Sequence, residues 1–114
     1  MDIAIYRERI KGELDALAQA SADARDARAP VELDQQSVGR LSRMDAMQVQ
    51  AMAKETERRR KARMEVLRGA IKRMDAGEFG FCTACGEEIA EKRLDLDAAV
   101  ATCIDCAAGG RRGR

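Results

Sequence analysis

Residues 77–106 read GEFGFCTACGEEIAEKRLDLDAAVATCIDC and contain all four cysteines of the chain. The cysteines form two CxxC pairs, Cys82 with Cys85 and Cys103 with Cys106, separated by 17 residues. Each CxxC pair forms a tight knuckle that presents two thiolates to one ion, so two knuckles complete a tetrahedral shell of four sulfurs. Zinc suits soft thiolate ligands. We therefore predict one structural Zn²⁺, with no coordination position left open for a reactive water.

The alternative to a metal site is a pair of disulfides. The chain begins MDIAIYRERIKGELD, in which charged and apolar residues alternate, so this stretch does not have the pattern of a signal peptide. Its apolar runs are far shorter than the roughly 20 residues that span a bilayer, so we expect no membrane association. We expect a cytoplasmic location, where thiols stay reduced and metal ligation is favoured over disulfides.

The composition explains why the chain needs a metal. It has 114 residues, of which 21 are Lys or Arg and 20 are Asp or Glu, and only one Tyr and two Phe are aromatic. So short a chain with so few large apolar groups cannot build one deep core, and metal binding is a common substitute. It also contains no histidine, which excludes Ser-His-Asp and Cys-His catalysis. With no phosphate-binding loop either, we predict that the protein is not an enzyme.

Upstream of the cysteines, helical periodicity predicts two long helices. The first covers residues 3–27, and Pro30 ends it. The second starts with Asp34, Ser37 or Ser42 as its cap and ends near Ala76. The apolar stripes that we expect to pair are Ile3, Tyr6, Ile10, Leu14, Leu17 and Ala24 on the first helix, with Leu41, Met44, Met47 and Ala51 and then Met64, Leu67, Ile71 and Met74 on the second.

These elements predict a mainly α fold. Residues 1–76 form an antiparallel coiled-coil hairpin whose tip lies within about residues 28–45. A small C4 zinc-finger module with a short helix follows over residues 77–108, and residues 109–114 form a basic disordered tail. In the module we expect positive φ angles at the glycines that flank the first knuckle. The expected mini-core is Phe79, Phe81, Ile89, Leu94, Leu96 and Ile104.

Charge argues against nucleic acid as the partner of the module. Between Cys85 and Cys103 there are five acidic and two basic residues, whereas a finger that docks on phosphates needs positive charge. The excess of positive charge lies in residues 36–76, with eleven basic and five acidic side chains. The run KETERRRK, residues 54–61, is interpreted either as a solvated helix face held by i,i+4 pairs or as a positive patch for a phosphate-bearing ligand or an acidic partner.

The module resembles the C4 zinc finger of the DksA/TraR family, also called DnaK suppressor proteins. The family pattern G-x-[FY]-G-x-C-x-x-C-G-x-x-I-x-x-x-R-L, followed by eight residues and C-x-x-C, is matched throughout. The matching residues are Gly77, Phe79, Gly80, Cys82, Cys85, Gly86, Ile89, Arg93, Leu94, Cys103 and Cys106. A proline common in the last stretch is absent, and Ala98 stands near its place. The predicted hairpin also fits the coiled coil of the family.

This resemblance implies a transcription regulator. Family members bind bacterial RNA polymerase without DNA, insert the coiled coil into its secondary channel and modulate initiation, often together with the alarmone ppGpp. The resemblance therefore implies RNA polymerase as the partner and no direct sequence-specific DNA binding. We also expect the protein to be a monomer. The alternatives are a DNA-binding C4 zinc finger protein and a zinc-stapled protein-interaction module.

The resemblance also implies partner-binding residues, but this chain differs from the family at the tip of the hairpin. The family's tip motif D-x-x-D-x-A is absent, and an ungapped count from Cys82 places its two acids on Gly39 and Ser42. The nearest acids are Asp34 and Asp45, the latter followed by Ala46. Among the basic residues Arg58 and Arg59 are the candidates. Arg59 falls near a family position linked to ppGpp, whereas Val66 stands where a second basic residue of that site is expected.

Overall fold

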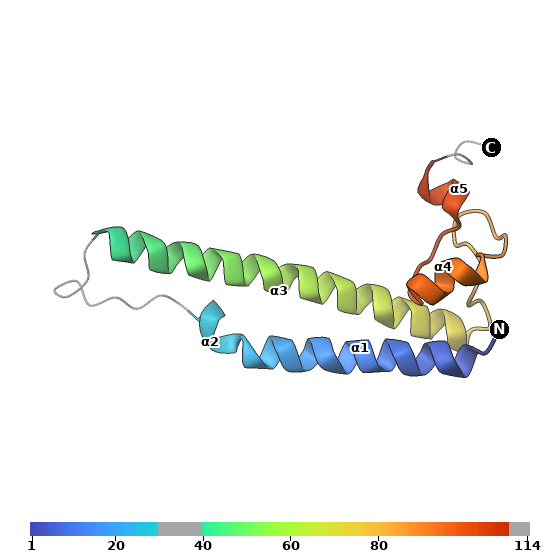
Figure 1. Cartoon of the computed structure of the whole chain (residues 1–114), viewed down its shortest axis with the longest axis horizontal. Coiled ribbons are helices and arrows are strands. Elements are labelled where there is room, and N and C mark those ends of the chain that lie inside the picture. Colours follow the sequence, from blue (N-terminus) through green and yellow to red (C-terminus); the bar gives the residue numbers. More distant parts are fainter. Residues whose placement is uncertain (30–39, 110–114) are drawn as a thin grey trace. The chain divides into compact units, whose positions relative to one another are not determined.

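The computed structural model describes residues 1–29 and 40–109, except for the side chains of residues 40–42. These residues form five helices (Figure 1): α1 (Ile3–Asp23), α2 (Arg25–Arg28), α3 (Arg40–Asp75), α4 (Glu91–Leu96) and α5 (Ile104–Ala107). In this part of the chain the only β pairing is an isolated antiparallel bridge between Phe81 and Glu88. None of the described helices combines the length and the apolarity needed to cross a bilayer. The predicted mainly α fold is confirmed.

The described chain divides into two compact units, and both long helices contribute to each. The terminal unit comprises Met1–Leu14 and Glu65–Arg114, and the central unit comprises Asp15–Met64. The predicted tip within residues 28–45 and the tail of residues 109–114 fall largely outside the described residues, as do Asp34 and Ser37. Ser42 lies inside α3, so it is not the cap of that helix.

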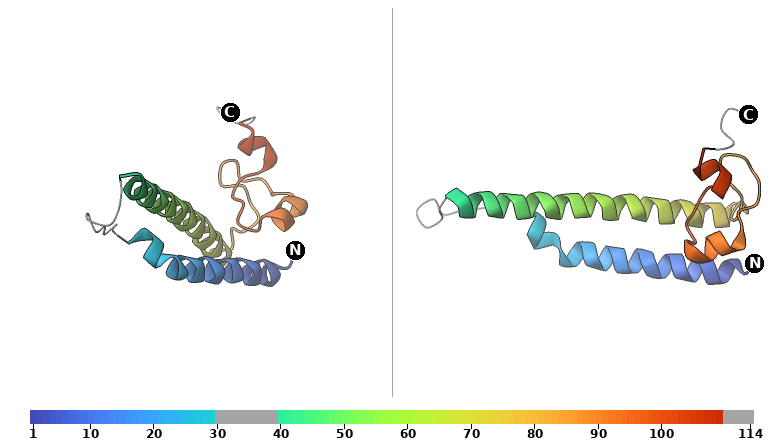
Figure 2. Two further views of the ribbon diagram at one scale, coloured as in Figure 1. Left: turned by 60° about the vertical axis from the view of Figure 1, so that its left-hand side comes forward. Right: turned by 45° about the horizontal axis from the view of Figure 1, so that its top comes forward.

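In the terminal unit, the beginning of α1 lies beside the end of α3 (Figure 2), where Arg7 forms an ion pair with Asp75 at 3.0 Å. Tyr6 connects α1 to the cysteine-rich segment. Its hydroxyl donates a hydrogen bond to the Asp95 carboxylate at 2.5 Å, and its ring lies 5.6 Å from that of Phe79. The hydrogen bond to Asp95 raises the pKa of Tyr6 to about 12, so the phenol keeps its proton and remains a donor at neutral pH.

The core of the terminal unit differs in part from the predicted mini-core. Phe79, Ile89 and Leu94 are buried as expected, but three other members are not: Phe81, Leu96 and Ile104 are 44%, 88% and 62% exposed. Their places are taken by side chains from the long helices and by two alanines. The buried residues added from these sources are Tyr6, Ile10, Leu67, Ala70, Met74, Ala98 and Ala99. The module is thus packed against the helix pair, a tertiary effect that local sequence patterns do not reveal.

In the central unit, α3 runs antiparallel to the end of α1 and to α2. Ser21 bonds Glu57, and further along the pair the Ala29 carbonyl accepts from Gln50 at 2.6 Å. The predicted antiparallel pairing is therefore present, but the predicted stripe at Met44, Met47 and Ala51 is wrong, since these residues are exposed.

One 3-4 repeat along α3 consists entirely of less exposed positions. Its members are Arg43, Ala46, Gln50, Ala53, Glu57, Arg60, Met64, Leu67, Ile71 and Met74. Glu55, Arg63, Gly69, Ala70 and Arg73 lie beside this repeat and are also less exposed. This repeat extends the 3-4 spacing of the Met64–Met74 stripe toward the start of α3, where small and polar residues occupy it. The most hydrophobic residues near the start of α3 therefore lie outside the less exposed face of the helix.

Glu57 is the buried acid of the central unit, with 6% of its surface exposed. It accepts a hydrogen bond from the Ser21 hydroxyl at 2.6 Å and contacts Arg60 at 2.6 Å and Arg28 at 3.3 Å. Arg28 also donates to the Ser21 carbonyl at 2.9 Å. The Ser21 hydroxyl and the two guanidinium groups lower the pKa of Glu57 below its ordinary value, so this network favours the ionised carboxylate.

The Glu57 network predicts acid sensitivity of the helix pair in the central unit. Because the pKa of Glu57 is lower in the folded than in the unfolded chain, its contribution is complete above about pH 4.5 and is lost as pH falls through the folded pKa. We expect Glu57→Gln to lower the melting temperature at pH 7 and to flatten its dependence on pH below 5. Thermal unfolding followed at the amides of residues 15–29 measures this.

Glu65→Gln is the matched control, because Glu65 is exposed on the same helix and pairs with the exposed Arg68. It should retain the wild-type dependence on pH. Equal pH profiles for wild type and Glu57→Gln would show that the buried carboxylate does not govern this helix pair.

Candidate metal centre

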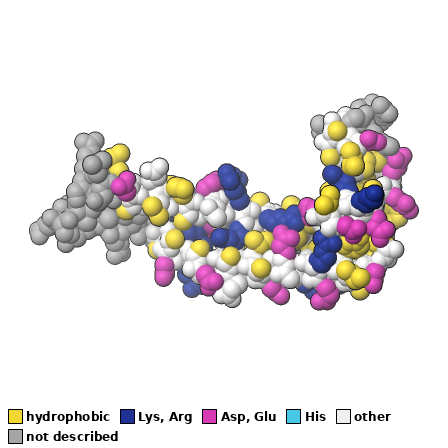
Figure 3. Space-filling view, in the orientation of Figure 1, with side chains coloured by type: hydrophobic (Ala, Val, Ile, Leu, Met, Phe, Trp, Pro, Cys, Tyr) yellow, Lys and Arg dark blue, Asp and Glu magenta, His cyan; other side chains and the backbone are white. Residues whose placement is uncertain are grey.

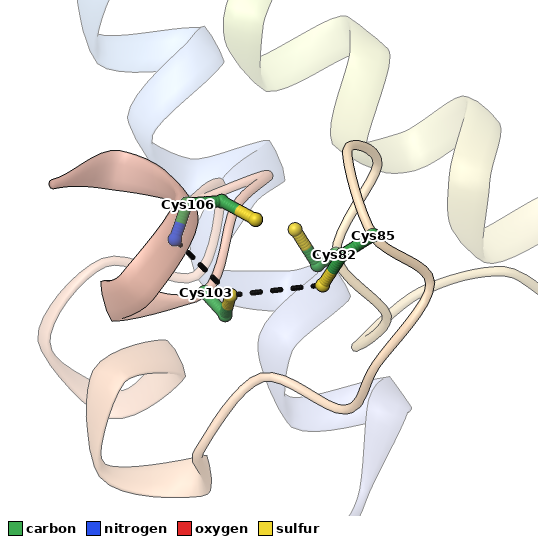
Figure 4. A group of neighbouring side chains, drawn as sticks. All are labelled: Cys82, Cys85, Cys103 and Cys106. Carbon is green, nitrogen blue, oxygen red and sulfur yellow. Dashed lines mark hydrogen bonds between the residues drawn. The ribbon is translucent and has the colours of Figure 1, made fainter. Parts of the chain in front are cut away.

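The four cysteine sulfurs converge on one point between the two knuckles (Figure 4). All lie within 4.8 Å of one another, and the Sγ atoms of Cys85 and Cys103 are 3.8 Å apart. A zinc ion with four Zn–S bonds of about 2.3 Å in a tetrahedron would hold its sulfurs about 3.8 Å apart. The cluster therefore has the ligand number, ligand type and spacing for one structural Zn²⁺. The four thiols are free, so the disulfide alternative is not adopted here.

The first knuckle is built by backbone turns that need glycine. The Gly86 amide donates to the Cys82 carbonyl at 2.8 Å, and the Cys82 amide donates to the Glu87 carbonyl at 2.7 Å. Gly80 and Gly86 have φ angles of 91° and 79°, which confirms the predicted positive values. A Cβ at Gly80 would also lie 2.8 Å from the Met1 methyl group, the movable end of a flexible side chain, so it is the positive φ that favours glycine there.

The second knuckle lies at the start of α5. The Cys103 side chain caps this short helix by accepting from the Cys106 amide at 3.4 Å, and the Ala107 amide donates to the Cys103 carbonyl at 2.9 Å. Both contacts pull the two thiols of this pair to the same side of the turn.

Hydrogen bonds to the segment before Cys103 hold the two knuckles in register. Thr83 bonds the Ala101 carbonyl twice, with its amide at 2.8 Å and its hydroxyl at 3.1 Å. From α4, Arg93 donates to the Thr102 carbonyl at 2.8 Å. Arg93, which the family pattern contains, thus positions the residue next to a cysteine of the cluster and does not contact the sulfurs itself.

The electrostatics of the cluster favour a bound cation. Backbone amides, that of Cys103 foremost, lower the pKa of Cys82 to about 6. Burial and the three neighbouring thiols raise the pKa of Cys106 to about 12. Four thiols in one small volume cannot all lose their protons without a positive charge between them. A metal ion supplies that charge. With four sulfurs around it, the ion would have a closed shell, which is suited to holding the fold together and not to hydrolysis.

The other predicted site residues lie on α3 or outside the described residues. Asp34 is among the residues that the structure does not describe. Asp45 is exposed in the first part of α3, and Ala46 is half-buried at a paired position. Arg58 and Arg59 are 70% and 77% exposed, and both bond the Glu55 carboxylate. These pairs lower the pKa of Glu55 to about 2, so Arg58 and Arg59 lie on a solvated face with internal ion pairs. Glu57 and Arg60 of the same run are instead largely buried.

Comparison with known proteins shows which type of zinc finger the cysteine-rich segment resembles. Residues 77–109 match the prokaryotic dksA/traR C4-type zinc finger. A curated relative, the RNA polymerase-binding transcription factor DksA of Haemophilus influenzae, is 40% identical over 43 residues. That match covers 38% of this chain and 30% of the relative, so it spans less than a third of the length of that protein.

A solved structure extends the likeness beyond the metal centre. The structure of transcription factor DksA2 from Pseudomonas aeruginosa is similar with a TM-score of 0.74, over 93% of this chain and 80% of that chain. At 18% identity this similarity establishes the fold. Together with the zinc-finger match and the curated relative, it confirms the resemblance of the chain to the DksA/TraR family.

Proposed function

We propose that this protein, whose metal centre is a zinc finger of the DksA/TraR type, is a transcription regulator that binds bacterial RNA polymerase through its secondary channel and modulates initiation. The observation that carries the proposal is a C4 cluster within a fold that resembles DksA2 over 93% of the chain. The curated relative is named for binding RNA polymerase. The zinc is structural, and the protein acts in the cytoplasm as a monomer and not as an enzyme.

The charges of the module support a protein partner over DNA. The exposed acids of the module include Glu87, Glu88 and Glu91, and they would repel phosphates. The DNA-binding alternative predicts that the isolated module binds a DNA duplex and retards it in a gel, and that added salt weakens this binding. The same acids are compatible with a zinc-stapled module that binds another protein, which remains the alternative if polymerase does not bind.

Two acids are the candidates for the residue that acts near the catalytic centre of the polymerase. Asp45 is exposed and is followed by Ala46, which is half-buried on α3. Asp34 lies outside the described residues. Arg58 and Arg59, the candidate basic residues, form ion pairs with Glu55. Val66 stands where a second basic residue of the ppGpp site is expected and carries no charge. We therefore expect ppGpp to have little effect on this protein.

An in vitro transcription assay on a ribosomal-type promoter tests this assignment. We expect Asp45→Asn or Asp34→Asn to reduce the effect of the protein on initiation at least tenfold while polymerase binding is kept, because the substitution removes charge and preserves shape. Asp15→Asn, at an exposed position of α1, is the matched control and should keep full effect. Full activity of both Asn variants would contradict a functional carboxylate at the tip.

A further inference from the structure

A second site is formed on the terminal unit by a cavity of about 550 Å³. Its apolar lining comes from Met1, Phe81, Ile89 and Leu94, and two exposed acidic residues line it as well, Glu88 and Glu91. The size lies within the range of pockets that hold ligands. Figure 3 shows acidic and hydrophobic side chains gathered together over the C-terminal module.

The shape of this cavity depends on local backbone geometry. The bridge between Phe81 and Glu88, and the bond from the Ile89 amide to the Gly80 carbonyl at 2.7 Å, fix the two sides of the loop. Because Gly80 has no Cβ, the Met1 side chain can approach its backbone. The Leu94 side chain is fully buried, whereas 44% of Phe81 stays exposed. The backbone on this side of the cavity is therefore fixed by its own hydrogen bonds.

The charges of the cavity are not neutralised within the described residues. Neither Glu88 nor Glu91 has an ion-pair partner there, although both residues line the cavity beside apolar residues. By contrast, Glu55, Glu57 and Glu65 each pair with an arginine. A carboxylate beside apolar surface is stabilised by a cation that also covers that surface.

We propose that this cavity binds an arginine side chain presented by a partner protein. A guanidinium group is planar and has five donors, so it can bond two carboxylates and stack on the exposed ring of Phe81 at the same time. Its aliphatic stem would lie along the exposed side chain of Met1. A lysine ammonium offers no planar face, and a phosphate would be repelled by the acids. The site is distinct from the cysteine cluster and from the acids and arginines of α3, and it does not depend on which protein is the partner.

The zinc-loaded full chain, labelled with ¹⁵N, tests the proposal by titration with acetyl-leucyl-arginine amide. We expect saturable shifts of the Phe81, Ile89 and Leu94 amides at millimolar concentration. The citrulline analogue has nearly the same shape without charge, and we expect it to bind at least fivefold more weakly. The double variant Glu88→Gln/Glu91→Gln should weaken arginine binding at least tenfold. Glu78→Gln, an exposed acid outside the cavity, should leave it unchanged.

Three results would overturn the proposal. The first is equal binding of the arginine and citrulline peptides, and the second is the absence of shifts at the cavity. The third concerns the arginines of residues 110–114. If deletion of these residues strengthens peptide binding tenfold or more, then the occupant is the chain's own tail and not a partner.

Discussion

Removal of zinc is expected to unfold residues 77–106 and to leave most of the helical signal intact. Zinc binding contributes about 10 kcal/mol or more to folding in small zinc modules, whereas the module itself supplies only a few large buried side chains, such as Phe79, Ile89 and Leu94. Cys103→Ser should have the same effect as a chelator, because it removes one of the four sulfur ligands while its hydroxyl can still cap α5. Far-UV circular dichroism reports the helices, and ¹H–¹⁵N spectra report the module.

The contacts of α1 with α3 explain why the helices should survive. In the central unit, the bonds of Ser21, Gln50 and Glu57 join residues of that unit alone and require no cysteine. Ala84→Ser is the matched control, since Ala84 is exposed within the first knuckle and is not a ligand. A complete loss of the far-UV signal in Cys103→Ser would show that the helix pair has no stability of its own.

The second large effect is expected for Leu67→Ala. Leu67 is fully buried on α3, at the point where the helix packs against the terminal-unit core. Truncation of such a leucine removes apolar contacts and leaves a cavity, at a cost of about 2–5 kcal/mol. For a domain of this size the melting temperature should fall by roughly 10 °C or more. Thermal unfolding of the zinc-loaded protein measures this.

Val66→Ala is the control for Leu67→Ala, because Val66 is the adjacent residue on the same helix and is 47% exposed. We expect a change within about 0.5 kcal/mol for this variant. Similar losses for the two variants would mean that the 3-4 repeat of α3 does not mark its buried face.

The metal centre is the feature that the sequence defines most completely. The CxxC spacing requires only local turns and one ion, so ligand identity follows from it, and the glycines at 80 and 86 have the expected φ angles. The long helices follow from periodicity in the same way. The α1 boundary was predicted less well, since the helix ends at Asp23 and a separate turn, α2, follows.

What could not be predicted depends on contacts between distant residues. Near the start of α3, Arg43, Ala46 and Gln50 are the less exposed positions, while the more apolar Met44 and Met47 are exposed. The buried face there continues the 3-4 repeat of the apolar stretch further along the helix. In the same way, Leu96 and Ile104 are exposed because residues of α1 and α3 complete the core around the metal centre. A hydrophobicity pattern identifies a face of a helix, but it does not identify what covers that face.

Direct binding to core RNA polymerase tests the central claim most directly. The zinc-loaded protein is mixed with core enzyme in the absence of promoter DNA, and co-elution in gel filtration is measured over a range of concentrations. We predict a saturable complex at micromolar concentration or below. No association at micromolar concentration, with a folded and zinc-loaded protein, would contradict the proposed function.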